Sequence, residues 1–228
     1  MLKEGFKEQS ERKRYLKISK GVLKERVPKG TEGAFESITE EGKVIYDRHF
    51  ASFTGKLVSV KYKESDRGYK GQYYFDMEAS GEIVSIIANE GTAANVLINK
   101  LLNCNLQELI LIKPYYFEDE KKLRIVLIQE EGNREVKIKP FYNKDNGHEK
   151  YPTLEKEWNE LSVYDQNAFK QSMDLFFHEV GLKQLQEKLS FDELEERVTE
   201  VEEANEIAAQ EDQNRQYIDE SDLPDFLQ

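Results

Sequence analysis

The chain has 228 residues and a formal net charge of −12, with 38% hydrophobic and 34% charged residues. That length accommodates one core with appendages or two small domains. A single cysteine, Cys104, excludes an internal disulfide bond and a cysteine-based zinc site, which fits a reducing cytoplasm. The sequence has no apolar run of membrane-spanning length and no signal-like leader, so we expect a cytoplasmic protein without a membrane anchor.

The negative charge is concentrated at one end of the chain. Residues 191–228 contain 14 acidic and 2 basic residues, whereas residues 1–190 are electrically balanced. Residues 1–30 carry a net charge of +6. This separation of charge, and not the total, indicates that part of the chain could meet a polyanion.

Residues 1–30 are predicted to form a basic, mobile or half-helical arm. The segment Arg12–Arg14, with Tyr15 beside it, is the part of this arm best suited to contact phosphates. The few apolar residues make at most a weak helical face: Leu16, Ile18, Val22 and Leu23.

Residues 31–145 are predicted to form the central domain. Short runs rich in β-branched and aromatic residues predict strands, and the change to helical spacing over residues 92–102 predicts a helix with Thr92 as its N-cap. Residues 33–53 are expected to add one more strand leading into the barrel, with the alternative that the loop-like residues 31–42 form an extension packed beside it. The predicted strands cover residues 53–63, 72–78, 82–88, 106–116, 123–129 and 136–142.

Three strands, a helix and further strands follow each other in the order of an OB-fold, a five-stranded Greek-key barrel that binds oligonucleotides. We therefore predict a mainly β protein of the α+β class, with an OB-like barrel and flanking helices.

Residues 150–210 are predicted to form a helical extension. Aromatic and apolar residues at helical spacing are expected to pack on the barrel, with Gly181 as a break and Ser190 as the N-cap of an acidic helix. Residues 211–228 are acidic and polar, so we expect a disordered tail that cannot fold alone. The helical residues expected on the barrel include Phe169, Met173, Phe176 and Phe177.

Catalytic motifs are missing from the sequence. It contains no glycine-rich phosphate loop and no nucleophile elbow, and the three histidines are not spaced as metal ligands. We predict a protein that is not an enzyme and that holds no metal or cofactor. The histidines are His49, His148 and His178.

Binding of single-stranded nucleic acid needs positive charge along the backbone and flat aromatic faces on which bases stack. The predicted strands and one loop offer both kinds of side chain at close spacing. Two similar segments, residues 112–116 and 138–142, each place a lysine and two aromatic residues next to a proline that marks a sheet edge or exit. The candidate DNA-binding residues are Lys56, Lys61, Lys63, Arg67, Tyr69, Lys70, Tyr74, Lys113, Tyr115, Tyr116, Lys139, Phe141 and Tyr142.

Strand alternation separates the candidates from the core. Tyr73 and Phe75 share one face of their strand and Tyr74 lies on the other. We expect Tyr62 to be part of the core, and Tyr74 to be free to stack on a base.

The end of the chain resembles the acidic tip of bacterial and phage single-stranded DNA-binding proteins, in which acidic residues precede a hydrophobic–proline pair and a phenylalanine. The order of the predicted elements is similar to the OB-folds of the phage members. The matching tail residues are Asp219, Glu220, Asp222, Leu223, Pro224, Asp225 and Phe226.

The resemblance implies a protein that coats single-stranded DNA during replication, recombination and repair, without strong sequence preference. It also implies that the tail recruits a polymerase, primase or helicase, and that the source is a bacteriophage acting in its host's cytoplasm. Two alternatives remain open: a protein-interaction module that binds no nucleic acid, and binding of single-stranded RNA. The sequence leaves the oligomeric state open.

Overall fold

A computed structural model describes residues 13–39, 42–65, 70–132, 134–143 and 148–191. The chain divides into two units, Met1–Leu189 and Ser190–Gln228. The architecture below is that of the first unit, because the acidic tail and most of the predicted acidic helix lie outside the described residues.

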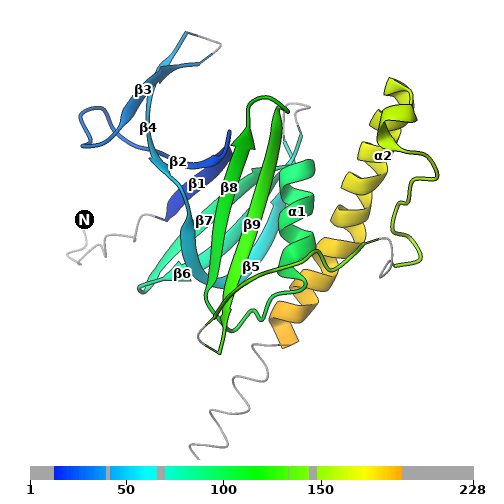
Figure 1. The fold of residues 1–228 in the computed structure, drawn as a ribbon. Helices are drawn as coiled ribbons and strands as arrows, with labels where there is room; N and C mark the ends of the chain where they lie inside the picture. Colours follow the sequence, from blue (N-terminus) through cyan, green and yellow to red (C-terminus); the bar gives the residue numbers. More distant parts are fainter. Residues whose placement is uncertain (1–12, 40–41, 66–69, 133, 144–147, 192–228) are drawn as a thin grey trace, which may run out of the picture. The chain divides into compact units, whose positions relative to one another are not determined.

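The first unit is mainly β, with one helix between β7 and β8 and the other helical segments after the last strand (Figure 1). The helical segments are α1 (Thr92–Leu101), η1 (Trp158–Glu160, a 3₁₀ turn), α2 (Val163–Phe176) and η2 (Phe177–Gly181, a π-helical turn), and residues 182–191 continue as helix. The strands are β1 (Arg14–Ser19), β2 (Val22–Arg26), β3 (Phe35–Ile38), β4 (Val44–Phe50), β5 (Phe53–Lys63), β6 (Gln72–Ala79), β7 (Glu82–Asn89), β8 (Ile110–Phe117), β9 (Lys122–Glu131) and β10 (Arg134–Lys137).

The ten strands form one hydrogen-bonded sheet in the order β10-β9-β8-β5-β6-β7-β1-β2-β4-β3. All neighbours are antiparallel except β1 and β7, which run parallel. The long strand β5 pairs with β8 near its start and with β6 after a bulge between Leu57 and Ser59. A bulge bends a strand, so β5 belongs to both halves of the sheet.

The predicted closed five-stranded barrel is not confirmed, because the sheet is open. The predicted order of three strands, a helix and two further strands is present in β5 to β9 and α1. However, β7 pairs on its outer edge with β1, and β9 pairs on its outer edge with β10. The two edges that would have to meet in a barrel are therefore both occupied by other strands.

The predicted basic arm is wrong over its described part, because residues 14–26 form β1 and β2 inside the sheet. Leu16 and Leu23 are buried at 2% and 0% exposure, respectively. Lys20 and Gly21 connect the two strands with φ values of 42° and 78°, the backbone of a two-residue hairpin turn. The alternation of apolar and polar residues along β1 is a strand pattern, and burial of its apolar side holds the segment in place.

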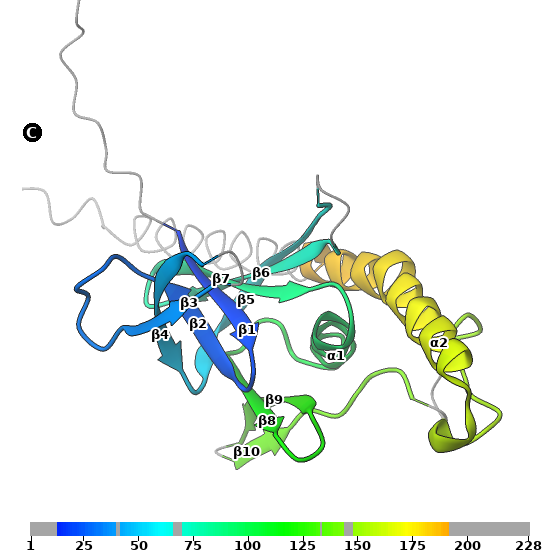
Figure 2. The same ribbon diagram turned by 90° about the horizontal axis from the view of Figure 1, so that it is seen from above.

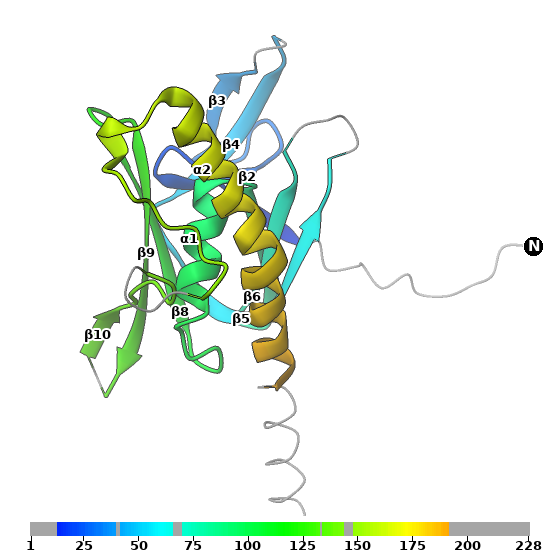
Figure 3. The same ribbon diagram turned by 90° about the vertical axis from the view of Figure 1, so that its right-hand side faces the viewer.

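Helix α1 lies between the strands and α2, as Figures 1 and 3 show. Ala94, Leu97, Ile98 and Leu101 are completely buried, which is the spacing of one helical face. The predicted helix is confirmed, but Gly91 occupies the N-cap position and Thr92 is the first helical residue. Seen from above, α1 separates the β6–β7 side of the sheet from β8 and β9 (Figure 2).

The C-terminal helical segment packs its aromatic residues as predicted at Phe176 and Phe177, which are 4% and 1% exposed. Gly181 does not break the helix, because residues on both sides of it are helical. A Cβ atom at Gly181 would lie 2.8 Å from the Phe177 ring and 3.0 Å from the Ile98 side chain, so a glycine permits this close approach. Ser190 likewise lies inside helical residues 182–191 and does not cap a new helix.

Candidate nucleic-acid interface

One face of the sheet packs on α1, and the opposite face of six neighbouring strands carries polar and basic side chains. The registers place one residue from each strand side by side. We call this set the cross-strand row. In order from β5 to β4 it consists of Lys61, Tyr74, Ile87, Lys17, Lys24 and His49. Since neighbouring strands lie about 4.8 Å apart, the row is on the order of 24 Å long.

Two lysines of the row, Lys17 and Lys24, are direct cross-strand partners. Like charges directly opposite each other destabilise a sheet, so this pair is unfavourable for folding. A bound polyanion would remove that repulsion. Beyond Lys24, the ring of His49 stacks on Phe35 of β3, with centroids 4.8 Å apart and planes 18° from parallel. Phe35 is 58% exposed, so the row ends in an open aromatic surface.

A hollow of about 650 Å³ lies on the β5–β6–β7–β1 part of this face. We call it the trough. Tyr15, 48% exposed, is the β1 neighbour of Ser85, and Ser85 is the β7 neighbour of Asp76. The trough therefore combines the exposed ring of Tyr15 and the half-buried rings of Tyr62 and Tyr74 with several ammonium groups, and single-strand binding requires aromatic rings and positive charge together. Its lining residues are Lys13, Tyr15, Lys61, Tyr62, Lys63, Tyr74, Asp76 and Ile87.

A single buried carboxylate, Asp76, organises the floor of the trough. Its side chain accepts hydrogen bonds from Ser59 at 2.8 Å and from Ser85, and it pairs with Lys13 at 2.7 Å and with Lys61 at 3.4 Å. Burial acts to raise the pKa of Asp76, but the hydrogen bonds from Lys13, Ser85 and Ser59 outweigh it and hold the pKa below its ordinary value. Asp76 thus keeps two lysines at fixed positions on the face.

We expect Asp76→Asn to lower the free energy of unfolding by about 1–3 kcal/mol at pH 7, because two ammonium groups lose their partner. A depressed pKa in the folded state contributes stability above the unfolded pKa of about 3.9, and this contribution is lost as pH falls through the folded pKa. The difference between wild type and variant should therefore shrink below about pH 4. Urea unfolding of wild type and variant at several pH values measures this difference in the free energy of unfolding. A difference that stays constant down to about pH 3, roughly one unit below the ordinary pKa, contradicts a lowered pKa for Asp76.

Three of the sequence-predicted residues line the trough: Lys61, Lys63 and Tyr74. Lys56 lies on the same strand opposite Glu78, outside the trough. Tyr62, expected in the core, is half-buried against it, and its hydroxyl donates to Glu90 at 3.2 Å. The alternation argument for β6 is confirmed, because Tyr73 and Phe75 are fully buried while Tyr74 is not.

The β8 candidates lie elsewhere. Lys113, Tyr115 and Tyr116 belong to a strand on the other side of α1 from β6 and β7 (Figure 2), and none of them lines the trough. The Lys113 ammonium instead lies 5.2 Å from the centroid of the Tyr115 ring. The two Lys–Pro segments therefore do not converge with Tyr74 on one surface.

Tyr142 is wrong as a DNA-binding residue, because it is 4% exposed and belongs to the core. Its ring packs at 5.0 Å from that of Phe176, its hydroxyl donates to Gln184, and its backbone exchanges hydrogen bonds with the Asn99 side chain. Lys139 and Phe141 are exposed beside it, but they lie outside the trough.

Lys70 is exposed and its ammonium group lies 3.2 Å from Asp174 on α2, away from the trough. Arg67 and Tyr69 lie outside the described residues. So do the predicted partner-binding residues of the tail: Asp219, Glu220, Asp222, Leu223, Pro224, Asp225 and Phe226.

The cross-strand row also contains residues that the sequence-predicted set omits. Lys17 lies on β1 and Lys24 on β2. The sequence does contain a signal for Lys17, because the apolar residues Leu16 and Ile18 alternate with polar ones and so place Lys17 on the opposite face of the strand. His49 and Phe35 carry no comparable signal, because their proximity depends on the pairing of β3 with β4.

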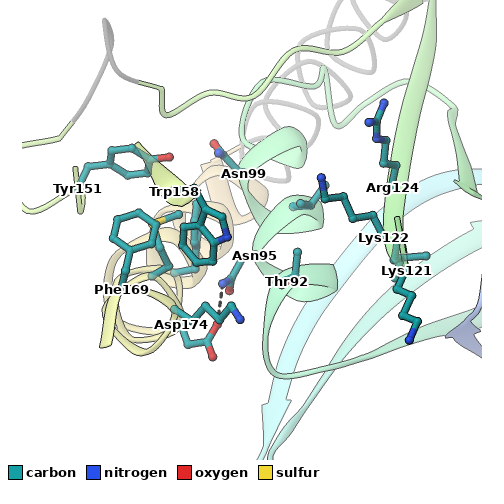
Figure 4. A pocket seen from close by; sticks show the side chains of 15 residues that line it. Thr92, Asn95, Asn99, Lys121, Lys122, Arg124, Tyr151, Trp158, Phe169 and Asp174 are labelled. Atoms are coloured by element: carbon teal, nitrogen blue, oxygen red, sulfur yellow. Dashed lines mark hydrogen bonds between the residues drawn. The ribbon is translucent and has the colours of Figure 1, made fainter. Parts of the chain in front are cut away.

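A second hollow, of about 930 Å³, lies between α1, the start of β9 and α2 (Figure 4). We call it the α2 pocket. One side is aromatic, with Trp158 and Phe169 edge to face at 6.1 Å. The other side carries the basic side chains Lys121, Lys122 and Arg124.

The floor of the α2 pocket is polar. Asn95 is 8% exposed, and its Nδ2 donates to Asp174 Oδ1 at 2.7 Å. Among the described residues its Oδ1 has no hydrogen-bond partner. Turning the amide around would bring two oxygens together, so the unpaired atom is the oxygen. An unpaired buried acceptor costs about 1–3 kcal/mol.

Comparison of the chain with protein-family models, curated proteins and solved structures gives no match. Within the described residues, no three His, Cys, Asp or Glu side chains come together as a metal site requires. None of the helices in that same part of the chain is long and apolar enough to cross a membrane.

Proposed function

We propose that the chain binds single-stranded DNA across the open face of strands β5, β6, β7, β1, β2 and β4. The observation that carries this proposal is the cross-strand row, with three lysines, a tyrosine and a histidine in register on one surface. The lysines would neutralise phosphates, and Tyr74, Tyr15 and the Phe35–His49 pair would stack on bases. Stacking contributes about 1–3 kcal/mol per base and accepts every base, so sequence preference would be weak.

The fold supports the proposal through its central elements. Strands β5 to β9 with α1 follow the order of an OB-fold, and β5 pairs with both β6 and β8. We propose that the first unit is an opened relative of that fold, in which β1 to β4 extend the binding face beyond β7.

In the proposed role the chain coats exposed DNA in replication, recombination and repair, and it acts by binding and not by catalysis. The phage-like tail motif supports a viral protein in the host cytoplasm, whose tail recruits a polymerase, primase or helicase. These roles depend on the resemblance of residues 219–226, which lie outside the described residues.

The direct test is fluorescence anisotropy of a labelled oligodeoxythymidylate, with unlabelled single-stranded DNA, single-stranded RNA and duplex DNA as competitors at two salt concentrations. We expect single-stranded DNA to compete best and its affinity to fall steeply with salt. Equal competition by RNA would favour the RNA alternative. An unchanged anisotropy at low salt would contradict nucleic-acid binding altogether.

Deletion of residues 211–228 should raise DNA affinity and make its salt dependence steeper. The tail is tethered and acidic, so it can occupy a basic surface at high effective concentration and compete with DNA. The same anisotropy titration on the full and shortened chains measures the effect. Replacing the segment by an uncharged Gly/Ser linker of equal length is the matched control for chain length. If both affinity and salt slope stay unchanged, the tail does not compete.

The exposed β3–β4 hairpin favours the second candidate function, a protein-interaction module. Phe35, Ile38 and Val44 are 58%, 69% and 45% exposed, and β3 is the last strand of the sheet. An edge strand with exposed apolar residues can pair with another chain. If the chain is a protein-interaction module, Ile38→Lys should weaken partner binding. Neither wild type nor the variant should then change the anisotropy of a labelled oligonucleotide.

A further inference from the structure

We propose that the α2 pocket binds a nucleotide, with the base between the aromatic side and the floor, and the phosphate on the basic side. This site is distinct from the cross-strand row and does not depend on it. The two share no residue, and the row lies on the face of the sheet opposite α1, whereas α1 itself lines the pocket.

The size and polarity of the pocket fit a small molecule. A volume of about 930 Å³ is at the upper end of the range for ligand pockets, which combine apolar walls with a few placed polar groups. Here Trp158, Phe169 and Tyr151 supply the flat apolar surface (Figure 4). Lys170 places its ammonium 5.5 Å from the Trp158 ring centroid and adds positive charge beside the stacking surface.

The basic side is suited to a phosphate. Lys121 lies in the turn between β8 and β9, Lys122 is the first residue of β9, and Arg124 follows in the same strand. Lys122 and Arg124 share one carboxylate, Glu120, at 3.1 Å and 3.7 Å. Their side chains are 66% and 58% exposed, so these ion pairs are weak and a phosphate could replace them.

The floor identifies the ring as a hydrogen-bond donor. Asn95 Oδ1 has less than 1 Å² of accessible surface, so the acceptor that a ligand can reach is the neighbouring Asp174 carboxylate, whose side chain is 12% exposed. Nucleobases carry N–H groups on their pairing edges, so a base in the pocket would donate to the Asp174 carboxylate. A flat ring, an N–H donor and an anionic group together describe a nucleotide.

Trp158 is the only tryptophan of the chain, so its fluorescence reports occupancy of the pocket. Titration of the full chain with dAMP should quench it in a saturable way. Deoxyadenosine and inorganic phosphate, which each lack one half of the ligand, should bind at least tenfold more weakly. Lys121→Ala/Lys122→Ala should lower the affinity for dAMP about tenfold, whereas Lys17→Ala/Lys24→Ala should leave that affinity unchanged.

Asn95→Leu tests the polar floor of the pocket and should also lower the affinity for dAMP. Thermal melting confirms that this variant folds. Trp158→Ala, followed by calorimetry, tests the stacking surface without relying on fluorescence. A free nucleotide and a nucleotide within a strand are distinguished by adding oligodeoxyadenylate to Lys17→Ala/Lys24→Ala/Lys61→Ala. If oligodeoxyadenylate quenches Trp158 in this triple variant, the pocket binds a nucleotide that is part of a strand. If only dAMP quenches Trp158, the pocket binds a free nucleotide.

The proposal is overturned if dAMP gives neither quenching nor heat up to about 10 mM, where even millimolar binding would register. It is also overturned if a peptide of residues 219–228 quenches Trp158 and dAMP does not, because the pocket would then be a peptide site. Neither result bears on the cross-strand row, which the oligonucleotide anisotropy of wild type and its lysine variants tests separately.

Discussion

Replacement of Lys17, Lys24 and Lys61 by alanine is expected to lower the affinity for single-stranded DNA on the order of 100-fold at about 50 mM salt. Each phosphate contact on a single strand contributes about 0.7 to the slope of log K against log salt. Loss of three contacts should therefore reduce the slope by about 2. Anisotropy titrations of a labelled oligonucleotide at four or more salt concentrations measure both quantities.

The matched control is the triple variant Lys113→Ala/Lys137→Ala/Lys139→Ala, which removes the same charge from residues outside both the cross-strand row and the trough. Its DNA affinity and salt slope should stay close to wild type. If both triple variants lose the same affinity, binding responds to overall charge and the cross-strand row has no special role. If only the control loses affinity, the Lys–Pro segments form the interface.

Leu23→Ala is expected to lower the free energy of unfolding by about 2–5 kcal/mol, the usual cost of removing a buried leucine side chain. Leu23 is completely buried and pairs with Ile18 on one side and Phe50 on the other. Urea unfolding followed by circular dichroism measures the change. A mobile N-terminal arm would give a change close to zero, so the experiment decides between arm and strand.

Lys24→Ala is the control on the same strand, one position away and on the polar face. Its stability should lie within about 0.5 kcal/mol of wild type, as for most surface substitutions. Its DNA affinity should fall while that of Leu23→Ala, measured where the variant is folded, should not. This pair of variants separates the structural side of β2 from its proposed binding side.

The central elements were predictable because their signals are local. Alternation assigns Tyr73 and Phe75 to the core and Tyr74 to the opposite face, and helical spacing identifies α1 from its apolar residues. The strands of the two hairpins after α1 are connected by charged or glycine-containing turns, such as residues 118–121 between β8 and β9. Local periodicity therefore yields the strands and their buried sides.

Partner choice between strands was not predictable, because it depends on contacts far apart in the sequence. Nothing in residues 14–19 indicates that β1 pairs with β7, and this pairing keeps the sheet open. The same limit applies to the site. Pro114 lies within β8 opposite Ile125, beyond the positions that pair with β5, so one Lys–Pro segment remains in the sheet while the other follows β10.

Insertion of β1 beside β7 has a consequence for synthesis on the ribosome. Strand β1 leaves the ribosome early, but Arg14 can pair with Val84 only after β7 has been synthesised. The sheet therefore cannot assemble in the order of translation. Until then the apolar side of the β1–β2 hairpin has no completed core to cover it. Nascent chains stalled before residue 82 should accordingly depend on chaperones, and those stalled after β7 much less.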